Sequence, residues 1–226
     1  MSELLDLVHR LSTSILRPDV TSGSSEILTF LGHDRNMHPG KAALAILVAA
    51  GALAAADFRL ADTHGAVHTP SEWRGHPAVV LFFVSTDCPV ANSYVPEMNR
   101  IRDAYASRGV LFFAVETDTT APESAVARYA ADYRYAFPML LDPHQALVRL
   151  ADARTVPQAA VFDAEGQRVY LGRIDNRVED FGKQRYQATE ADLRQALDAV
   201  LAGKQPPHAT TKSIGCAITR ISEATK

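Results

Sequence analysis

Cysteine is the side chain in this sequence best suited to redox chemistry, and it occurs only at Cys88 and Cys216. Cys88 comes shortly after an apolar run, residues 78–84, and directly before Pro89. Proline suits the first position of a helix, because its fixed φ fits there and its missing N–H would have had no partner. We therefore expect Cys88 at a helix N-terminus, where free N–H groups and the helix dipole stabilise a thiolate, the nucleophilic form.

Two features weigh against this interpretation. Most free cysteines are buried apolar side chains with no chemical role. The carboxylate of Asp87, next to Cys88, also disfavours a thiolate and opposes the helix dipole, so we expect only moderate activation. The redox interpretation is preferred, because strand-to-helix turns at the carboxyl edge of an α/β sheet are where such folds place their chemistry.

Cys216 has three interpretations. It could resolve a sulfenic acid or mixed disulfide on Cys88, with its tail swinging in. It could instead be an unpaired tail thiol, or form a permanent structural bridge that blocks catalysis. Pairing is favoured, because an exposed free thiol is a liability outside the cytoplasm. Two cysteines make neither a disulfide scaffold nor a zinc site.

The elements around Cys88 predict an α/β fold. The apolar run 78–84 is typical of a buried central strand. Strands and helices then alternate, which predicts parallel strands, and a hairpin at 161–171 adds antiparallel ones. The expected architecture is a single domain with a central mixed sheet flanked by helices. The expected later elements are a helix ending at Gly109, strands at 110–115 and 137–141, and helices at 122–135, 143–151 and 189–201, the last capped by Thr189.

A proline opens one expected central strand. Pro157 stands directly before the apolar residues 158–163, a position tolerated mainly at the first residue of a strand. A cis Val156–Pro157 bond would explain it.

Composition narrows the function classes. The chain has 226 residues, 47% of them hydrophobic, and a net charge of -3, as expected for one globular domain with appendages. Without a basic excess, a Gly-rich phosphate loop, an HExxH pair or a Cys-x-x-Cys pair, we predict no nucleic-acid partner and no cofactor. His64 and His68 are four apart, but Gly65 and Pro70 argue against a helix there, so no metal pair is expected.

The N-terminal residues indicate export. After Lys41, the uncharged run 42–56 has the length of a signal-peptide core and ends in three alanines, so cleavage would leave Asp57 first. Met37 is the favoured start, with residues 1–36 a non-native or disordered extension and 37–56 the signal peptide. Alternatively, the extension is real and the apolar run is a weak membrane anchor. In both cases the redox domain would face an oxidising, extracytoplasmic compartment.

Several short motifs together resemble one family. They are Asp62-x-x-Gly65, Trp73 to Pro77, the Cys88 turn, Val156-Pro157 and Asp163-x-x-Gly166. Over residues 57–203 they resemble the redoxin branch of the thioredoxin-like superfamily, which includes the alkyl hydroperoxide reductase/thiol-specific antioxidant proteins and extracytoplasmic thiol-disulfide oxidoreductases. A subgroup is similar at Ser85 to Val90, at Gly172 to Asp175, and at Gly215-Cys216 in the tail, 204–226.

The chain departs from the family patterns at identifiable positions. A thioredoxin-type dithiol has its second cysteine where Ala91 stands, so no local disulfide can close. A peroxiredoxin site resembles Pro-x-x-x-Thr-x-x-Cys, but here Leu81 replaces the proline. Ser85 stands in place of the threonine and keeps a hydroxyl, so the resemblance makes it a candidate catalytic residue. Arg154 and Arg173 are the candidate arginines for stabilising the thiolate.

The resemblance implies where a partner would bind. In a thioredoxin-like arrangement, residues 172–188 lie beside the cysteine turn, although they could also be a merely solvated loop. The candidate contact residues are Thr86, Asp87, Pro89, Arg154, Arg173, Asn176, Arg177, Lys183 and Arg185.

The implied function is an extracytoplasmic thiol oxidoreductase. Cys88 would attack a disulfide or a peroxide oxygen, Pro157 would shape the substrate groove, and Cys216 would resolve. The expected partners are a protein thiol, disulfide or peroxide substrate and an external thiol reductant, with membrane contact only through an uncleaved signal peptide. The alternative is a non-catalytic thioredoxin-like binding module with a structural or inert cysteine pair.

Overall fold

The computed structural model describes residues 57–221. The predicted extension and signal peptide, residues 1–56, lie outside the described residues, as do residues 222–226 at the end of the predicted tail.

A five-stranded mixed sheet forms the centre of the fold, in the order β5-β4-β3-β7-β8. β3 pairs in parallel with β4, which pairs in parallel with β5, whereas β7 is antiparallel to both β3 and β8. The predicted mixed sheet is thus confirmed. All seven side chains of β3 are buried, as the apolar run predicts for a central strand. The strands are β3 (Ala78–Val84), β4 (Leu111–Glu116), β5 (Met139–Leu141), β7 (Gln158–Asp163) and β8 (Arg168–Gly172).

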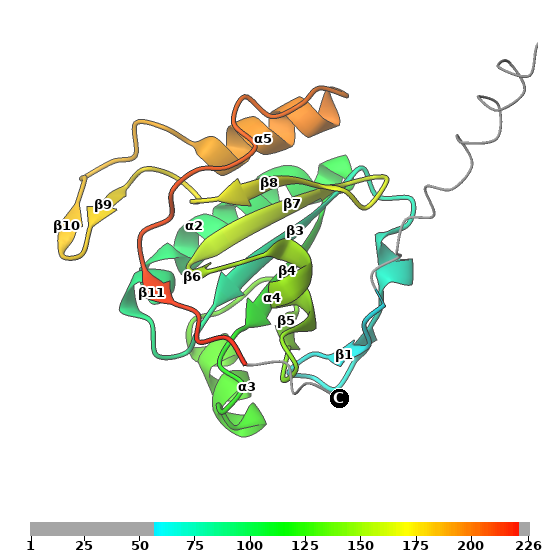
Figure 1. Cartoon of the computed structure of the whole chain (residues 1–226), viewed down its shortest axis with the longest axis vertical. Helices are drawn as coiled ribbons and strands as arrows, with labels where there is room; N and C mark the ends of the chain where they lie inside the picture. Colours follow the sequence, from blue (N-terminus) through cyan, green and yellow to red (C-terminus); the bar gives the residue numbers. More distant parts are fainter. Residues whose placement is uncertain (1–56, 222–226) are drawn as a thin grey trace, which may run out of the picture. The chain divides into compact units, whose positions relative to one another are not determined.

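Helices cover the sheet on both faces. They are α2 (Pro89–Tyr105), α3 (Glu123–Asp132), α4 (Ala146–Ala151) and α5 (Asp192–Leu201), with short 3-10 helices at Pro70–Trp73 and Ala106–Arg108. α2 and α5 pack together, because Arg194 on α5 donates to Glu97 on α2 at 2.9 Å. In Figure 1, α2 lies behind the strands and α4 in front of them. Both faces of the sheet are therefore shielded from water, which explains why its strands are almost wholly apolar.

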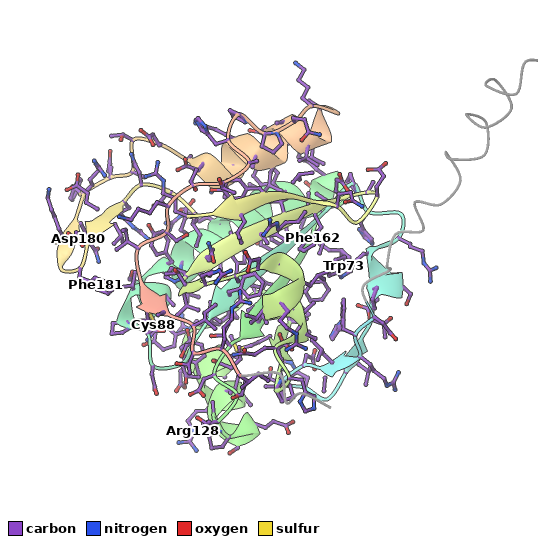
Figure 2. The ribbon with its side chains drawn as sticks, viewed as in Figure 1. Trp73, Cys88, Arg128, Phe162, Asp180 and Phe181 are labelled. Atoms are coloured by element: carbon purple, nitrogen blue, oxygen red, sulfur yellow. The ribbon has the colours of Figure 1, made fainter. Side chains whose placement is uncertain are left out.

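The only tryptophan closes one edge of the core. The ring of Trp73 lies 5.0 Å from that of Phe162 on β7 (Figure 2). It also lies 5.4 Å from the ring of Phe58. On the central strand, Phe82 stacks with Phe112 of β4, their centroids 6.3 Å apart. The rings of Phe58 and Trp73 thus join the N-terminal segment to the sheet, and the Phe82–Phe112 pair joins two strands within it.

Three small two-stranded sheets complete the described residues. β1 (Leu60–Ala61) pairs with β2 (Val67–His68), β9 (Val178–Asp180) with β10 (Lys183–Gln184), and β6 (Thr155–Val156) with β11 (Cys216–Ala217). The strands β9 and β10 fall inside the loop 172–188, and β11 inside the tail, where the sequence predicts no strands.

The predicted cap of the last helix is wrong. α5 begins at Asp192, and Ala191 holds the N-cap position without a side-chain hydrogen bond. The hydroxyl of Thr189 instead accepts a hydrogen bond from the side-chain amide of Asn176 at 2.7 Å, and the carbonyl of that amide accepts from the N–H of Thr189 at 2.8 Å. The side chain of Thr189 therefore bonds to a residue thirteen positions away in sequence instead of capping the helix.

A charged cluster stabilises the β1–β2 hairpin. The ring nitrogens of His68 lie 2.8 Å from Glu72 and 3.2 Å from Asp62. Burial disfavours the charged ring, but the hydrogen bonds to Glu72 and Asp62 outweigh it and raise the pKa of His68. The charged imidazolium therefore stabilises the fold.

Replacing His68 with glutamine is expected to lower the free energy of unfolding at pH 6 by about 1 kcal/mol, and by less at pH 9. Because the folded pKa is raised, the stabilisation is complete below the unfolded pKa and is lost as pH rises through the folded one. Urea unfolding at both pH values measures it. The exposed His64→Gln variant is the control, and an equal loss at both pH values would contradict the charge explanation.

Candidate functional site

Cys88 lies at the N-terminus of α2, as the sequence predicts. It is the N-cap residue, with extended backbone, and Pro89 is the first residue of the helix. Its N–H donates to the carbonyl of Ser85 at 3.1 Å, which closes a tight turn after β3, and its own carbonyl accepts the N–H of Asn92 at 3.0 Å. The turn therefore places Cys88 next to the first free N–H groups of the helix, although its side chain makes no capping hydrogen bond to them.

The strand before β7 contacts the sulfur directly. The Val156–Pro157 bond is cis, as predicted, and the thiol of Cys88 donates to the carbonyl of Val156 at 3.3 Å. Cys88 is only 1% exposed and belongs to the hydrophobic core. Pro157 thus lies beside the cysteine, where the sequence places it.

The tail brings Cys216 to the same place. β11 pairs antiparallel with β6, so that Cys216 lies opposite Val156 and Ala217 opposite Thr155. In Figure 1, β11 is drawn in red beside β6, and Figure 2 shows Cys88 next to it. A tail 128 positions away in sequence therefore covers the cysteine turn.

Two glycines let the tail approach this closely. A Cβ on Gly215 would lie 2.0 Å from the carbonyl oxygen of Val156, and a Cβ on Gly172 would lie 2.1 Å from the hydroxyl oxygen of Thr211. Both distances are far below van der Waals contact, and at Gly215 the obstacle is backbone. The glycines of the Gly-Arg-Ile-Asp and Gly-Cys motifs are thus the places where the tail crosses the domain.

The two thiols contact each other. Both cysteines are free, and the pKa of the Cys216 thiol is raised to about 11 by burial, by its hydrogen bond with Cys88 and by the negative charge on Cys88. The Cys216 thiol therefore keeps its proton more firmly than an ordinary cysteine does. A disulfide could close here without the large tail movement that the sequence interpretation envisages.

The tail is anchored on both sides of Cys216. Upstream, the N–H of Thr211 donates to the carbonyl of Leu171 on β8 at 3.2 Å. Downstream, the buried side chain of Gln145 donates to the carbonyl of Thr219 at 2.8 Å and accepts the N–H of Ile221 at 3.0 Å. Cys216 is held in place rather than carried on a loose arm.

A buried carboxylate supports the cysteine turn, and the sequence analysis missed it. Glu116, the last residue of β4, is 3% exposed. Its carboxylate accepts the N–H of Thr86 at 3.2 Å and that of Asp118 at 2.9 Å. Burial raises the pKa of Glu116 to about 7, although these N–H groups oppose the shift. The sequence feature that could have identified Glu116 is an acidic residue directly after five apolar residues of a strand.

A network of hydroxyl groups lies near the same carboxylate. The hydroxyl of Tyr129 donates to the side-chain carbonyl of Asn92 at 2.8 Å and lies 2.9 Å from that of Tyr135. Burial raises the pKa of Tyr129, and the negative charges of Glu116 and Cys88 raise it further. These tyrosines therefore stay neutral and serve as hydrogen-bond donors within the electrostatic reach of the sulfur.

The candidate arginines have carboxylate or aromatic partners. Arg154 donates to Asp152 at 2.9 Å, and Arg173 pairs with Asp192 at 2.8 Å and also with Glu190. The guanidinium of Arg177 lies 4.3 Å from the centre of the Tyr94 ring. A role for Arg154 or Arg173 at the thiolate would require these ion pairs to open.

The candidate catalytic residue Ser85 and the remaining predicted contact residues lie in two places. The hydroxyl of Ser85 accepts the N–H of Asp87 at 3.4 Å, so it is engaged within the turn. Arg173, Lys183 and Arg185 from the loop meet Ile214 of the tail around an open pocket of about 300 Å³. The loop and the residues just before Cys216 thus share one surface.

Residues 57–221 offer neither a metal site nor a membrane-spanning helix. In that range, no three His, Cys, Asp or Glu side chains are grouped so that they could hold a metal ion. No helix in it has the length and apolar character needed to cross a membrane.

The sheet order, the cysteine at the start of α2 and the cis-proline beside its sulfur define a thioredoxin-like protein. A family model described as the AhpC/TSA family matches residues 52–170. The chain therefore belongs to the AhpC/TSA family, as its motifs suggest.

Solved structures agree with this fold. A hypothetical protein from Sinorhizobium meliloti 1021 is 31% identical, with a TM-score of 0.65 over 74% of this chain and 93% of that one. An uncharacterized conserved protein from Geobacillus kaustophilus is 26% identical, with a TM-score of 0.64 over 74% of this chain and 90% of that one.

Two curated relatives carry the name thiol-disulfide oxidoreductase ResA. The one from Geobacillus kaustophilus is 29% identical over 113 residues, which is 50% of this chain and 63% of the relative. The one from Geobacillus thermodenitrificans is 28% identical over 148 residues, or 65% of this chain and 75% of the relative. The chain thus spans less than two thirds of the first of these proteins.

Proposed function

We propose that this chain is a thiol-disulfide oxidoreductase whose redox unit is the pair Cys88 and Cys216. The observation that carries the proposal is the placement of both thiols in contact, one at a helix N-terminus and the other on a strand that crosses beside the cis-proline. The curated relatives named thiol-disulfide oxidoreductases support the same reaction class.

In the proposed reaction, Cys88 is the nucleophile. Its thiolate attacks one sulfur of a substrate disulfide, the substrate S–S bond breaks, and the departing sulfur leaves as a thiolate that takes up a proton. Cys216 then loses its proton and attacks the Cys88 sulfur, which expels the second substrate thiol and closes the Cys88–Cys216 disulfide. The substrate gains two electrons, and an external thiol reductant restores the pair.

Substrate access to Cys88 requires β11 to move. The sulfur is buried under a strand of only two residues, so this pairing is the weak point of the cover. The pocket between the loop and the tail is a candidate surface for the protein substrate or the reductant.

A redox titration tests the proposal. The full chain is equilibrated in glutathione buffers of graded potential, and free thiols are alkylated and counted by mass spectrometry. We expect one two-electron transition, which both Cys88→Ser and Cys216→Ser abolish, together with reduction of a model protein disulfide by the wild type alone. A pair that never oxidises, or that glutathione never reduces, would instead support the non-catalytic binding module.

Peroxide reduction is the second candidate, because the chain belongs to the AhpC/TSA family. Cys88 would then attack a peroxide oxygen and become a sulfenic acid, which Cys216 would convert to the disulfide with loss of water. Hydrogen peroxide and dimedone, added to the Cys216→Ser variant, distinguish the two reactions. Labelling of Cys88 within seconds would favour the peroxidase, whereas labelling as slow as that of an ordinary free thiol would favour disulfide exchange.

We also propose that the domain works outside the cytoplasm. The support is the sequence alone: an uncharged run, 42–56, that ends in a small-residue cleavage pattern. The mass of the mature protein from an extracytoplasmic fraction tests this, with Asp57 expected as its first residue.

A further inference from the structure

A pocket separate from the cysteine turn lies between α2, α5 and the loop 172–188. Its volume is about 240 Å³, and neither cysteine lines it. Arg100 on α2, Arg177 in the loop and Arg194 on α5 define this pocket, which we call the arginine pocket. Guanidinium groups from three segments of the chain therefore line one cavity.

The two carboxylates of the arginine pocket already have partners. Glu97 pairs with Arg100 at 2.7 Å and with Arg194 at 2.9 Å. Asp175 accepts a tyrosine hydroxyl at 2.7 Å and the main-chain N–H of Arg177 at 2.9 Å. Three positive groups thus face two negative ones, and the positive charge that remains is that of Arg177.

Arg177 forms no ion pair with a carboxylate among residues 57–221. The face of its guanidinium group lies over Tyr94, 4.3 Å from the ring centre. Its Nη2 donates to the carbonyl of Ser93 at 3.4 Å, and its buried Nε has no acceptor in the part of the chain that the structure describes. A guanidinium group has five N–H donors, all at its edge. Stacking on the ring therefore occupies the face of the group and leaves its charge and most of its donors unmatched.

The main chain holds Arg177 in this position. The N–H of Arg185 donates to the carbonyl of Arg177 at 2.8 Å. On the other side of the pocket, the N–H of Leu193 on α5 donates to the carbonyl of Ile174 in the loop at 3.2 Å. The loop is thus tied to α5, so a ligand would meet a formed site and would lose little free energy in ordering the chain.

We propose that the arginine pocket binds a small molecule through an oxyanion group, either a carboxylate or a phosphate. Such a group accepts two parallel hydrogen bonds from one guanidinium, and the edge of Arg177 offers this geometry. Tyr186, which is 98% exposed and also lines the pocket, adds a hydroxyl group. The cavity is smaller than the roughly 300–1,000 Å³ of drug-sized pockets, so it suits a small anion. This site does not depend on the proposed redox function.

Isothermal titration calorimetry of the full chain tests the proposal. Citrate and inorganic phosphate are titrated separately, at an ionic strength kept constant with potassium chloride. We expect saturable binding of at least one of them, with one site per chain, and a loss of about tenfold or more in affinity in Arg177→Gln. Arg128→Gln, an exposed substitution on α3 (Figure 2), removes the same charge elsewhere and should leave the affinity unchanged.

Thermal unfolding gives a second measurement. A ligand that binds only the folded protein stabilises it, so the melting temperature should rise with the concentration of the anion that binds. The rise should be smaller in Arg177→Gln. The same melting curves show whether that variant is folded.

Arg100→Gln keeps the test decisive if Arg177→Gln does not fold. The Arg100 side chain is 60% exposed, so its loss leaves the core intact, and the affinity should fall severalfold. Saturation by citrate alone would identify a carboxylate ligand, and saturation by phosphate alone a phosphate ligand. Absence of saturable binding of both anions, or wild-type affinity in folded Arg177→Gln or in Arg100→Gln, would overturn the proposal.

Discussion

Replacing Gly215 with alanine is expected to displace β11 and slow formation of the Cys88–Cys216 disulfide by about 100-fold. The new Cβ would lie 2.0 Å from the carbonyl oxygen of Val156 and 2.8 Å from its carbonyl carbon. Both atoms are backbone, next to a proline, so neither can turn aside as a side chain would. The tail must move away from β6, and Cys216 with it, and misplacement by about 1 Å is enough to cost two orders of magnitude in rate.

Two measurements check this result. Stopped-flow oxidation of the dithiol protein gives the rate of disulfide closure, and alkylation by iodoacetamide reports how exposed Cys88 has become. Closure should slow while alkylation of Cys88 accelerates, because the strand that buries it has moved. Lys212→Ala, an exposed substitution in the same tail, is the matched control and should change neither rate. Unchanged closure in Gly215→Ala would show that β11 does not position Cys216.

In the wild type, ionisation of Glu116 is expected to lower the free energy of unfolding by about 3 kcal/mol as pH rises. Replacing Glu116 with glutamine is expected to remove this loss. Burial raises the pKa of Glu116 from 4.5 to about 7, so its ionised form is disfavoured in the folded protein. The neighbouring charge of Asp118 acts in the same direction, while the N–H groups of Asp118, Thr86 and Thr117 oppose it. The protonated carboxyl group of Glu116 is favoured in the folded protein. Its contribution to stability is complete below the unfolded pKa and is lost as pH rises through the folded pKa.

Urea unfolding of wild type and variant from pH 4 to pH 9 measures this difference. Relative to Glu116→Gln, the wild type should lose stability between about pH 4.5 and pH 7 and stay level above that. The exposed Glu165→Gln variant controls for a general change of charge. Parallel profiles of wild type and Glu116→Gln would mean that Glu116 does not titrate in this range. Alkylation of Cys88 in the same samples shows whether the turn held through Thr86 responds to the same ionisation.

The cysteine turn could be predicted because its determinants are local. A buried strand, a cysteine and a proline at a helix start follow one another within about a dozen residues, and each has a steric or hydrogen-bonding preference of its own. The cis bond at Pro157 was also predictable, because a proline at the start of an apolar strand has few other solutions. Trp73 packs on the sheet because a large apolar ring needs a buried surface.

Local pattern failed where distant groups compete for the same atoms. Thr189 has the residue type of a helix cap, but its hydroxyl is hydrogen-bonded to Asn176, and α5 starts at Asp192. Glu116 reads as the polar end of a strand, and only the sheet shows that its carboxylate reaches the N–H of Thr86, thirty residues earlier. The arginines 154 and 173 are charged in the sequence, but folding gives them carboxylates as partners.

The sequence by itself determined the α/β class, the central strand and the place of Cys88 at a helix N-terminus, because these depend on apolar periodicity and on backbone preferences of neighbouring residues. Only the tertiary structure decided that Cys216 contacts Cys88 and that the tail strand covers it. That contact depends on close passage of two backbones at Gly215, a steric fit between segments far apart in the chain. No single stretch of the sequence predicts such a fit, because the fit exists only once both segments have packed together.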